Sequence, residues 1–598
     1  MAKELPKRSE VRVEDTGNTE DIYETVELWE ADLKKVVEMG EKLASYQGKI
    51  DSAESLYAVL RLNEDIDFIG GRLFGYAARV SDVDTTNSDN QKLVMRVRSE
   101  FVKLGEMASF LEPEILALPE GAIDRFYGEK PELARYKVYL KNVLRTKEHM
   151  LSPEMEKLLA SAGDVTGSCS NAFSMFNNAD LVFPEITDEN GETVRLTHGR
   201  YVPFLESADR RVRKDAFEAM YKTYASYKNM LAAIYTGNLK SHRFYAKARK
   251  YDTCLEAAVD RNDVPKEVYT NLIEAVHANL EKMYRYVRLR KKILGLDELH
   301  MYDLYTPLVK DADVKIPFDE AKKTVLEALA PLGTDYTDVI REGFENRWID
   351  VYENEGKRSG AYSSGIPGCH PFVLLNHSGT LDSMFTLAHE MGHAMHSYLS
   401  QKNQPYIDSQ YVIFVAEVAS TCNEVLLVKH LLAKTTDKVQ RAYLINHFLE
   451  SFRGTVYRQT MFAEFELMTH TAIEKGESLT PDVLCKMYLD LNRKYFGEDI
   501  TVDSDIEMEW ARIPHFYYNF YVYQYATGFS AAVALAEKIL SEGAPAVENY
   551  KKFLSGGCSK SPIDLLKIAG VDMTTPEPVN AGLKLFDELL GEMEELMQ

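Results

Sequence analysis

The segment FTLAHEMGHAMHSYLS, residues 385–400, contains the pentad His389-Glu390-Met391-Gly392-His393. On an α-helix, side chains four residues apart lie one above the other, so both imidazoles can reach one metal ion. Glu390 is offset from His393 by only about 60° at 3.6 residues per turn. Its carboxylate can therefore approach the open side of such an ion without binding it. This spacing predicts a helix that carries a hydrolytic metal centre, with two imidazole ligands and a general base.

The residues around the pentad help to distinguish a metal site from a chance match on a charged surface helix. Most of the helix circumference is apolar, which predicts burial, and ionisable groups on a buried helix need partners such as a metal ion. The apolar positions are Phe385, Leu387, Ala388, Met391, Ala394 and Met395. One common extension of the motif requires Gly three residues and His six residues after His393. This sequence has His396 and Leu399 there, which excludes that class. We expect His396 to be a packed histidine and not a ligand.

A catalytic zinc site needs a third protein ligand and an open fourth position. The best candidate is Glu417 in the next apolar helix, SQYVIFVAEVASTCNEVLLVKHLL, residues 409–432. A buried carboxylate is costly unless it is paired, and a zinc ion offsets that cost. A buried salt bridge to Arg or Lys is the alternative reading of Glu417. Glu424 lies two turns further on the same face, where it could hydrogen-bond a ligand histidine and fix its orientation, although a structural role fits equally well.

Helical periodicity extends over most of the chain, so we expect a mainly α fold. Two segments read as strands. Residues 180–205 carry the hairpin turn signal Asn190-Gly191 between β-rich runs, and residues 345–376 end in the apolar run Phe372–Leu375. That run is expected either to be an exposed strand edge that can pair with a peptide or to be an ordinary core strand. The first hairpin is the best place to divide residues 1–200, an N-terminal helical domain, from residues 201–598, the catalytic domain.

Bulk properties indicate an ordinary water-soluble protein of 598 residues with a net charge of −23. That charge disfavours nucleic acid and anionic membrane surfaces as partners. The N-terminus has no apolar signal segment, and no uncharged apolar run is long enough to cross a bilayer. Six scattered cysteines without a CxxC pair read as reduced thiols. We therefore expect a cytoplasmic protein.

Three separated motifs together resemble the thimet-oligopeptidase family of zinc peptidases, and most closely its oligoendopeptidase F branch. They are HPFVLLNHSGTLDSMFTLAHEMGHAMHSYL, then FVAEVASTCNE, and then IPHFYYNFYVYQYATG at residues 513–528. The N-terminal runs LPKRSEV and EDTGNTEDIY are also similar to the start of that branch, so the resemblance covers almost the whole chain.

The resemblance implies a two-lobed helical zincin-like metallopeptidase with a deep central channel that admits short unstructured peptides. It implies one Zn²⁺ per chain with His389, His393 and Glu417 as ligands and Glu390 as base. It also implies that His515 helps to bind the substrate and the transition state, with tyrosines downstream. Tyr518, Tyr521 and Tyr525 are all available for that role. If residues 513–528 are helical, these side chains and His515 project in one general direction, although an aromatic core stripe would look the same.

The expected activity is zinc-dependent cleavage of internal bonds in short oligopeptides. The metal would polarise the scissile carbonyl, and Glu390 would take a proton from the attacking water and pass it to the leaving amine. Two alternatives remain open at this stage. One is a metallocarboxypeptidase or dipeptidase on a similar helical scaffold, which would have to recognise a terminal carboxylate. The other is an inactive peptide-binding protein that retains the metal site, which the intact Glu390 disfavours.

Overall fold

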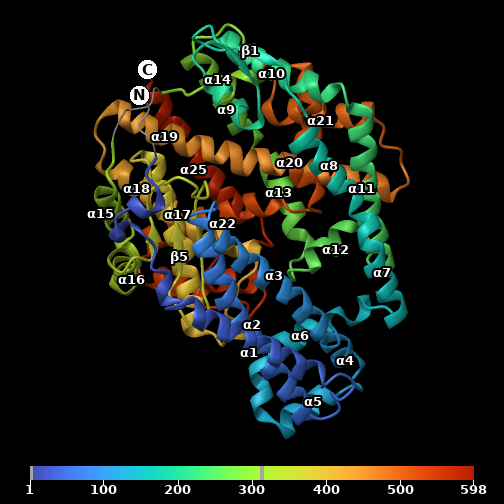
Figure 1. Ribbon diagram of the computed structural model, residues 1–598. Coiled ribbons are helices and arrows are strands. Elements are labelled where there is room, and N and C mark those ends of the chain that lie inside the picture. The colour runs from blue at the N-terminus through green and yellow to red at the C-terminus, as the bar shows by residue number, and fades with distance from the viewer. Residues whose placement is uncertain (1–4, 310–314, 598) are drawn as a thin grey trace. The chain divides into compact units, whose positions relative to one another are not determined.

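The computed structural model describes residues 5–309 and 315–597. Helices predominate along this part of the chain, as Figure 1 shows, and the only strands described there are five short ones, β1 to β5. Among the described residues, no helix is both long enough and apolar enough to cross a bilayer. The mainly α fold class expected from the sequence is therefore confirmed.

The chain forms two compact units, and each unit draws on three separate stretches of sequence. Unit 1 contains the described residues of Met1–Glu148, Val314–His430 and Leu535–Val571. Unit 2 contains those of His149–Asp313, Leu431–Ala534 and Asp572–Gln598. The predicted metal-site helices fall in unit 1, and the segment around His515 falls in unit 2.

Unit 1 is built from helices and one small sheet. Several helices begin where the sequence offers a side-chain cap: Thr25 accepts from the Leu28 N–H at the start of α1, and Ser52 accepts from the Ser55 N–H at the start of α2. The helices of this unit are α1 (Val26–Ala44), α2 (Ala53–Asp82), α3 (Ser88–Ala108), α4 (Leu111–Ala117), α5 (Ala122–Glu129), α6 (Lys137–Arg145), α15 (Phe318–Ala328), α16 (Thr334–Glu345), α17 (Leu381–Asn403), α18 (Ile413–Lys434, whose last turn enters unit 2), α23 (Ala544–Leu554) and α24 (Pro562–Ile568).

A three-stranded sheet precedes α17 in unit 1. Strand β5 (Phe372–Leu374) lies in the middle, parallel to β3 (Ile349–Asp350) and antiparallel to β4 (Tyr362–Ser364). The expectation that Phe372–Leu375 forms an exposed edge is wrong, because β5 is paired on both sides and buried, as the alternative core-strand reading held. The edge position next to it belongs to β4, in the Gly-rich segment, whose residues are only half-buried.

Unit 2 contains the second strand region. Strands β1 (Glu185–Thr187) and β2 (Thr193–Arg195) form the predicted antiparallel hairpin, with Gly191 at a φ of +82° in its turn. The strand expectation fails beyond it, because Thr197 caps a helix over His198–Glu206 by accepting from the Arg200 N–H. The main helices are α7 (Pro153–Thr166), α8 (Ser168–Met175), α9 (His198–Glu206), α10 (Arg210–Ala225), α11 (Lys228–Ala248), α12 (Cys254–Asp260), α13 (Lys266–Ala278), α14 (Leu280–Ile293), α19 (Lys438–Phe452), α20 (Arg458–Glu474), α21 (Pro481–Phe496), α22 (Tyr523–Glu542, whose last turns enter unit 1) and α25 (Glu577–Leu596).

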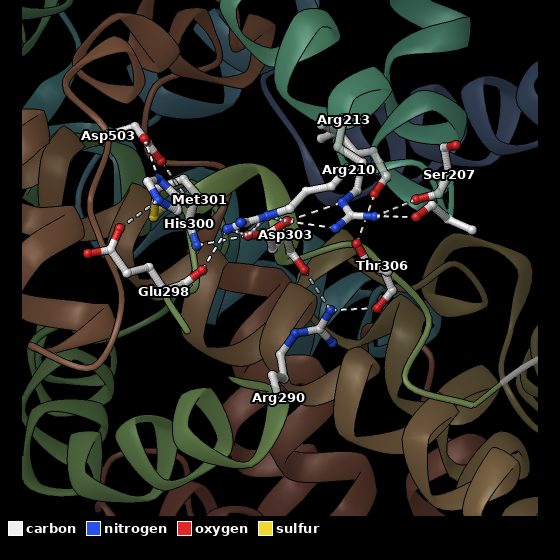
Figure 2. A network of polar contacts seen from close by, with 12 residues as sticks. Ser207, Arg210, Arg213, Arg290, Glu298, His300, Met301, Asp303, Thr306 and Asp503 are labelled. Carbon is white, nitrogen blue, oxygen red and sulfur yellow. Dashed lines mark hydrogen bonds and ion pairs between the residues drawn. The ribbon is translucent and has the colours of Figure 1, made fainter. Parts of the chain in front are cut away.

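A buried ionic network fastens the start of α10 and the end of α14 to the 3-10 turn Met301–Asp303 in unit 2. Figure 2 shows Arg210 and Arg213 converging on Asp303. Asp303 is fully buried, and its carboxylate lies 2.9 Å from a guanidinium nitrogen of each arginine. Arg290, which is also fully buried, donates to the backbone carbonyl oxygens of Asp303 and Thr306 at 2.9 and 2.6 Å. Each buried charge is thus paired or hydrogen-bonded, as burial requires.

Candidate metal centre

Helix α17 brings the two histidines of the motif onto one face. Its first turn is capped by Thr380, whose side chain accepts from the Ser383 N–H. The apolar positions around the motif are buried as predicted, including Leu387, Ala388 and Met391 at 0% exposure. The imidazoles of His389 and His393 remain partly accessible, with side-chain exposures of 25% and 17%, and their ring centroids lie 4.9 Å apart. One face of an otherwise buried helix is therefore open to solvent.

Helix α18 lies beside α17 at very short range (Figure 1). A Cβ atom on Gly392 would lie 2.5 Å from the Ser420 Cα and 2.7 Å from the Ala419 carbonyl oxygen, so only glycine permits this approach. The contact is fixed by Asn423, whose Nδ2 donates to the Ala388 carbonyl oxygen at 3.0 Å. The Tyr336 hydroxyl in turn donates to the Asn423 Oδ1 at 3.1 Å.

The close packing places Glu417 of α18 opposite the two histidines of α17. The Glu417 Oε2 lies 3.3 Å from the His389 Nε2 and 3.5 Å from the His393 Nε2. One ligand atom from each of the three residues can be chosen so that all lie within 4.8 Å of one another. Glu417 is not buried as expected from its apolar neighbours in sequence: its side chain is 36% exposed, since it shares the accessible face of the histidines.

These donors fit a zinc ion. Metal–ligand bonds of about 2.0–2.2 Å in a tetrahedral site separate neighbouring ligand atoms by about 3.3–3.6 Å, and the two separations from the Glu417 Oε2 agree with that range. Two imidazoles and one carboxylate also match the donor types that leave a fourth position open. Within the described residues this is the single group of three or more His, Cys, Asp or Glu side chains with such geometry.

The carboxylates of Glu424 and Glu417 affect the orientation and the pKa of His389. The Glu424 Oε1 lies 3.1 Å from the His389 Nδ1, the ring nitrogen that does not face Glu417. Burial lowers the pKa of His389, but the hydrogen bonds that its ring donates to Glu417 and Glu424 outweigh burial and raise the pKa to about 10. Partial burial raises the pKa of Glu417, whereas the two histidines hold it well below its ordinary value. A divalent cation bound between these residues would replace the proton on His389 and would be stabilised by the same two carboxylates.

Glu390, the predicted base, is buried with 6% exposure, and its Oε2 has no hydrogen-bond partner among the described residues. Burial raises its pKa above the ordinary value for a glutamate, although the neighbouring His389 and His393 lower it. His396 does not join the group: it is 1% exposed and its ring stacks on Tyr411 at 3.7 Å, as expected for a packed histidine.

The substrate-segment residues gather in unit 2, but not on a helix. Pro514–Tyr517 is a 3-10 turn, and α22 begins only at Tyr523. The condition considered from the sequence, a helix over the whole of residues 513–528, is therefore not met. The backbone bends at Asn519 and Phe520, which have φ values of +53° and +58°. The rings nevertheless surround His515, with centroids 5.6 Å away for Tyr518, 5.9 Å for Tyr521 and 6.0 Å for Tyr525. The Tyr525 hydroxyl lies 3.5 Å from the His515 Nε2.

Sequence reasoning missed three residues that build the site. Gly392 lies within the motif, at a position for which the motif requires no particular residue, so the close contact with α18 was not expected there. Asn423 is a polar residue in an apolar helix, directly before Glu424, and this pattern in the sequence could have identified it. Tyr336 lies far away in sequence on α16, and no local pattern connects it with α18.

Comparisons with known proteins agree with this fold and site. Residues 204–585 match Peptidase family M3, and residues 114–183 match Oligopeptidase F. The chain is 51% identical to the oligopeptidase PepF of Bacillus subtilis (strain 168), over 100% of this chain and 89% of that protein. A solved structure from Chlamydophila abortus is similar with a TM-score of 0.93 and 38% identity, covering 99% of this chain and 100% of that one. The oligoendopeptidase-F from Enterococcus faecium is similar with a TM-score of 0.74 and 39% identity, covering 96% of this chain and 99% of that one.

The resemblance drawn from the three sequence motifs is thereby confirmed, as is the expected enzyme class of metalloendopeptidases. The matched ranges cover the helices α17 and α18 that bring His389, His393 and Glu417 together. The chain belongs to peptidase family M3.

Proposed function

We propose that this peptidase cleaves internal bonds of short, unstructured oligopeptides, with Zn²⁺ held by His389, His393 and Glu417 and with Glu390 as general base. The observation that carries the proposal is the Glu390 carboxyl group, which is buried beside the three donors and has an oxygen without a hydrogen-bond partner among the described residues. A buried carboxyl group in this state is costly unless a ligand or a reaction uses it.

In the proposed mechanism, zinc, Glu390 and Glu424 have separate roles. When bound, zinc would polarise the scissile carbonyl and lower the pKa of water at its open position. Glu390 takes a proton from the attacking water, and its raised pKa suits it to hold that proton until the leaving amine receives it. Glu424 fixes the orientation of the His389 ring through the 3.1 Å contact with Nδ1.

His515, Tyr518, Tyr521 and Tyr525 are proposed to contact the substrate. Support comes from the family resemblance and from their gathering within unit 2. Burial lowers the pKa of His515, so its ring is neutral at neutral pH and can donate one hydrogen bond. Phenol and imidazole donors can stabilise a developing oxyanion. We also retain the proposed division at residue 200, with residues 1–200 as an N-terminal helical domain and 201–598 as the catalytic domain.

The preference for oligopeptides is supported by the names of the relatives, oligopeptidase PepF and oligoendopeptidase-F. A fluorogenic peptide blocked at both ends distinguishes internal cleavage from the action of a carboxypeptidase or dipeptidase. Cleavage of blocked peptides of graded length, with a folded protein left intact, is the expected result. Cleavage only after a free carboxyl terminus is restored would favour the exopeptidase alternative. A cytoplasmic location and the absence of nucleic-acid and membrane partners remain predictions.

The decisive experiment for the proposed base is the variant Glu390→Gln. It should keep one zinc ion per chain and lose about 10²- to 10⁴-fold in kcat, the usual contribution of a general base. The matched control is Glu342→Gln, at an exposed position on α16 of the same unit. The control should be fully active. Normal turnover by the zinc-loaded Glu390→Gln variant would refute the assignment.

A further inference from the structure

The segment that carries the proposed substrate-binding tyrosines contains an unusual backbone turn. Asn519 and Phe520 both have left-handed conformations, with φ values of +53° and +58°. Glycine adopts this region freely, whereas a bulky residue such as phenylalanine does so only when its surroundings force it. The Asn519 side chain does not stabilise the turn through its carbonyl oxygen, because the buried Oδ1 has no hydrogen-bond partner among the described residues. Some other group must therefore hold the turn.

That group is found on α20 of the same unit. The Glu466 Oε1 accepts a hydrogen bond from the Phe520 N–H at 3.0 Å. The Phe520 ring is 2% exposed and packs against His470 with a centroid distance of 4.3 Å and against Tyr269 at 5.5 Å. Backbone and ring of Phe520 are thus both anchored on elements outside the turn, and the hydrogen bond to Glu466 is the polar part of that anchor.

The carboxyl group of Glu466 is only partly satisfied by hydrogen bonds in the core. It is fully buried, and its Oε2 has no hydrogen-bond partner in the part of the chain that the structure describes. Burial raises its pKa to about 8, although the Phe520 N–H lowers it, so the carboxyl group is mostly neutral near pH 7. A methionine or leucine would fill the same space without the penalty of a buried acid. Among the residues that the structure describes, the one donor that binds the end of this side chain is the Phe520 N–H.

We propose that Glu466 is a positioning residue for the substrate segment, which holds the Asn519–Phe520 turn so that Tyr518 and Tyr521 are presented on either side of it beside His515. The inference rests on the proposed role of these residues in substrate binding. Tyr518 and Tyr521 directly flank the strained pair, and each ring lies within 6 Å of the His515 ring. Relaxation of the turn would rotate the peptide planes next to both tyrosines and move their rings away from the imidazole ring.

The test compares three variants of the zinc-loaded enzyme. Glu466→Met removes the acceptor and keeps the volume, whereas Glu466→Gln retains an acceptor oxygen. Glu464→Met is the matched control, because Glu464 lies on the same helix and its carboxylate binds Lys494 and Tyr495 at 2.9 and 2.8 Å, away from the turn. The direct measurement is amide hydrogen exchange at Phe520. The functional measurement is kcat/KM on a blocked peptide, together with zinc content.

Glu466→Met should speed exchange at Phe520 at least tenfold and lower kcat/KM by about 10- to 100-fold, the range expected for misplaced binding groups. Zinc content should stay at one per chain. Glu466→Gln should resemble the natural protein in both measurements. Protected exchange at Phe520 in Glu466→Met, or an equal loss of kcat/KM in Glu464→Met, would overturn the proposal. Should Glu466→Met fail to fold, Glu466→Asp withdraws the acceptor by one methylene, and the same two outcomes apply to it.

A double-mutant cycle separates this inference from the proposed function. If Glu466 acts through the tyrosines, adding Glu466→Met to Tyr521→Phe should lower kcat/KM by less than it does in the natural background. If Tyr518→Phe and Tyr521→Phe are both fully active, the proposed role of the segment in substrate binding fails. The exchange rate at Phe520 still decides in that case whether Glu466 anchors the turn.

Discussion

Replacing Gly392 by alanine should weaken metal binding, because this glycine sets the spacing between the two helices that supply the ligands. The added Cβ would meet backbone atoms, with the Ser420 Cα at 2.5 Å, the Ala419 oxygen at 2.7 Å and the Ser420 nitrogen at 2.8 Å. Backbone atoms of a buried helix cannot turn away as a flexible side chain can. Helix α18 must therefore move as a body, and Glu417 lies on it one turn before Ser420.

The size of the effect follows from that distance. Ordinary contact begins at 3.4 Å, so the helices must separate by about 0.9 Å. Zinc–ligand distances tolerate a change of only about 0.2 Å. Glu417 can therefore bind the ion only if the two helices return to their original spacing, against the contact made by the new Cβ. Overpacking of this kind typically costs about 1–3 kcal/mol. If binding must supply that energy, the dissociation constant for zinc rises by about 5- to 150-fold, since ~1.4 kcal/mol is tenfold.

Zinc affinity is measured by competition with a chromophoric chelator, with thermal unfolding recorded in parallel. Gly105→Ala is the matched control, since Gly105 lies within α3 of the same unit and a Cβ there would meet nothing within 4 Å. Alanine is the better helix former, so the control should gain about 0.5–1 kcal/mol of stability and bind zinc normally. A zinc affinity of Gly392→Ala within twofold of the natural protein would refute the reasoning.

Three further predictions concern the site and the two units. Glu424→Ala should lower zinc affinity by about 10- to 100-fold, because the His389 ring loses the acceptor that orients it, and chelator competition measures this. Glu509→Gln should remove stability near neutral pH: burial raises the pKa of the Glu509 carboxyl, but the partly exposed Arg458 and Arg512 outweigh burial and hold that pKa at about 2. A carboxylate with a depressed pKa stabilises the fold above its unfolded pKa of 4.5 and loses that contribution as the pH falls towards 2. Urea unfolding of this variant should show a loss of about 3 kcal/mol at pH 7 and a clearly smaller loss at pH 3, and equal losses at both would contradict the assignment. Asp303→Asn should destabilise unit 2 by about 3–5 kcal/mol, because it leaves the buried Arg213 charge without its carboxylate, and a thermal midpoint unchanged within 1 °C would show that the network of Figure 2 contributes little.

The metal-site geometry was accessible from sequence to the extent that it depends on local spacing. His389 and His393 are one helical turn apart, and their position on one face follows directly from that interval. Glu417 was found because an acid in an apolar helix needs an explanation. Its exposure was not predictable, because the accessible face of α18 is defined by side chains that come from other parts of the chain. The same holds for the contact at Gly392, which depends on how two helices pack.

The errors elsewhere in the fold have similar causes. Strand β5 was recognised as a strand, but its central place depends on pairing with β3 and β4, and pairing partners are not encoded locally. The bend at Asn519 and Phe520 lacks the glycine or proline that marks most turns. Its hydrogen bond is to Glu466, more than fifty positions earlier, so no local pattern distinguished this bend from a continuous helix.

The most direct test of the proposed metal centre is anomalous diffraction at the zinc absorption edge from crystals of the purified enzyme. The predicted result is one zinc peak per chain, at about 2.0–2.2 Å from a carboxylate oxygen of Glu417 and from the Nε2 atoms of His389 and His393. A fully active enzyme whose metal peak lies elsewhere, or which has no metal peak, would contradict the assignment.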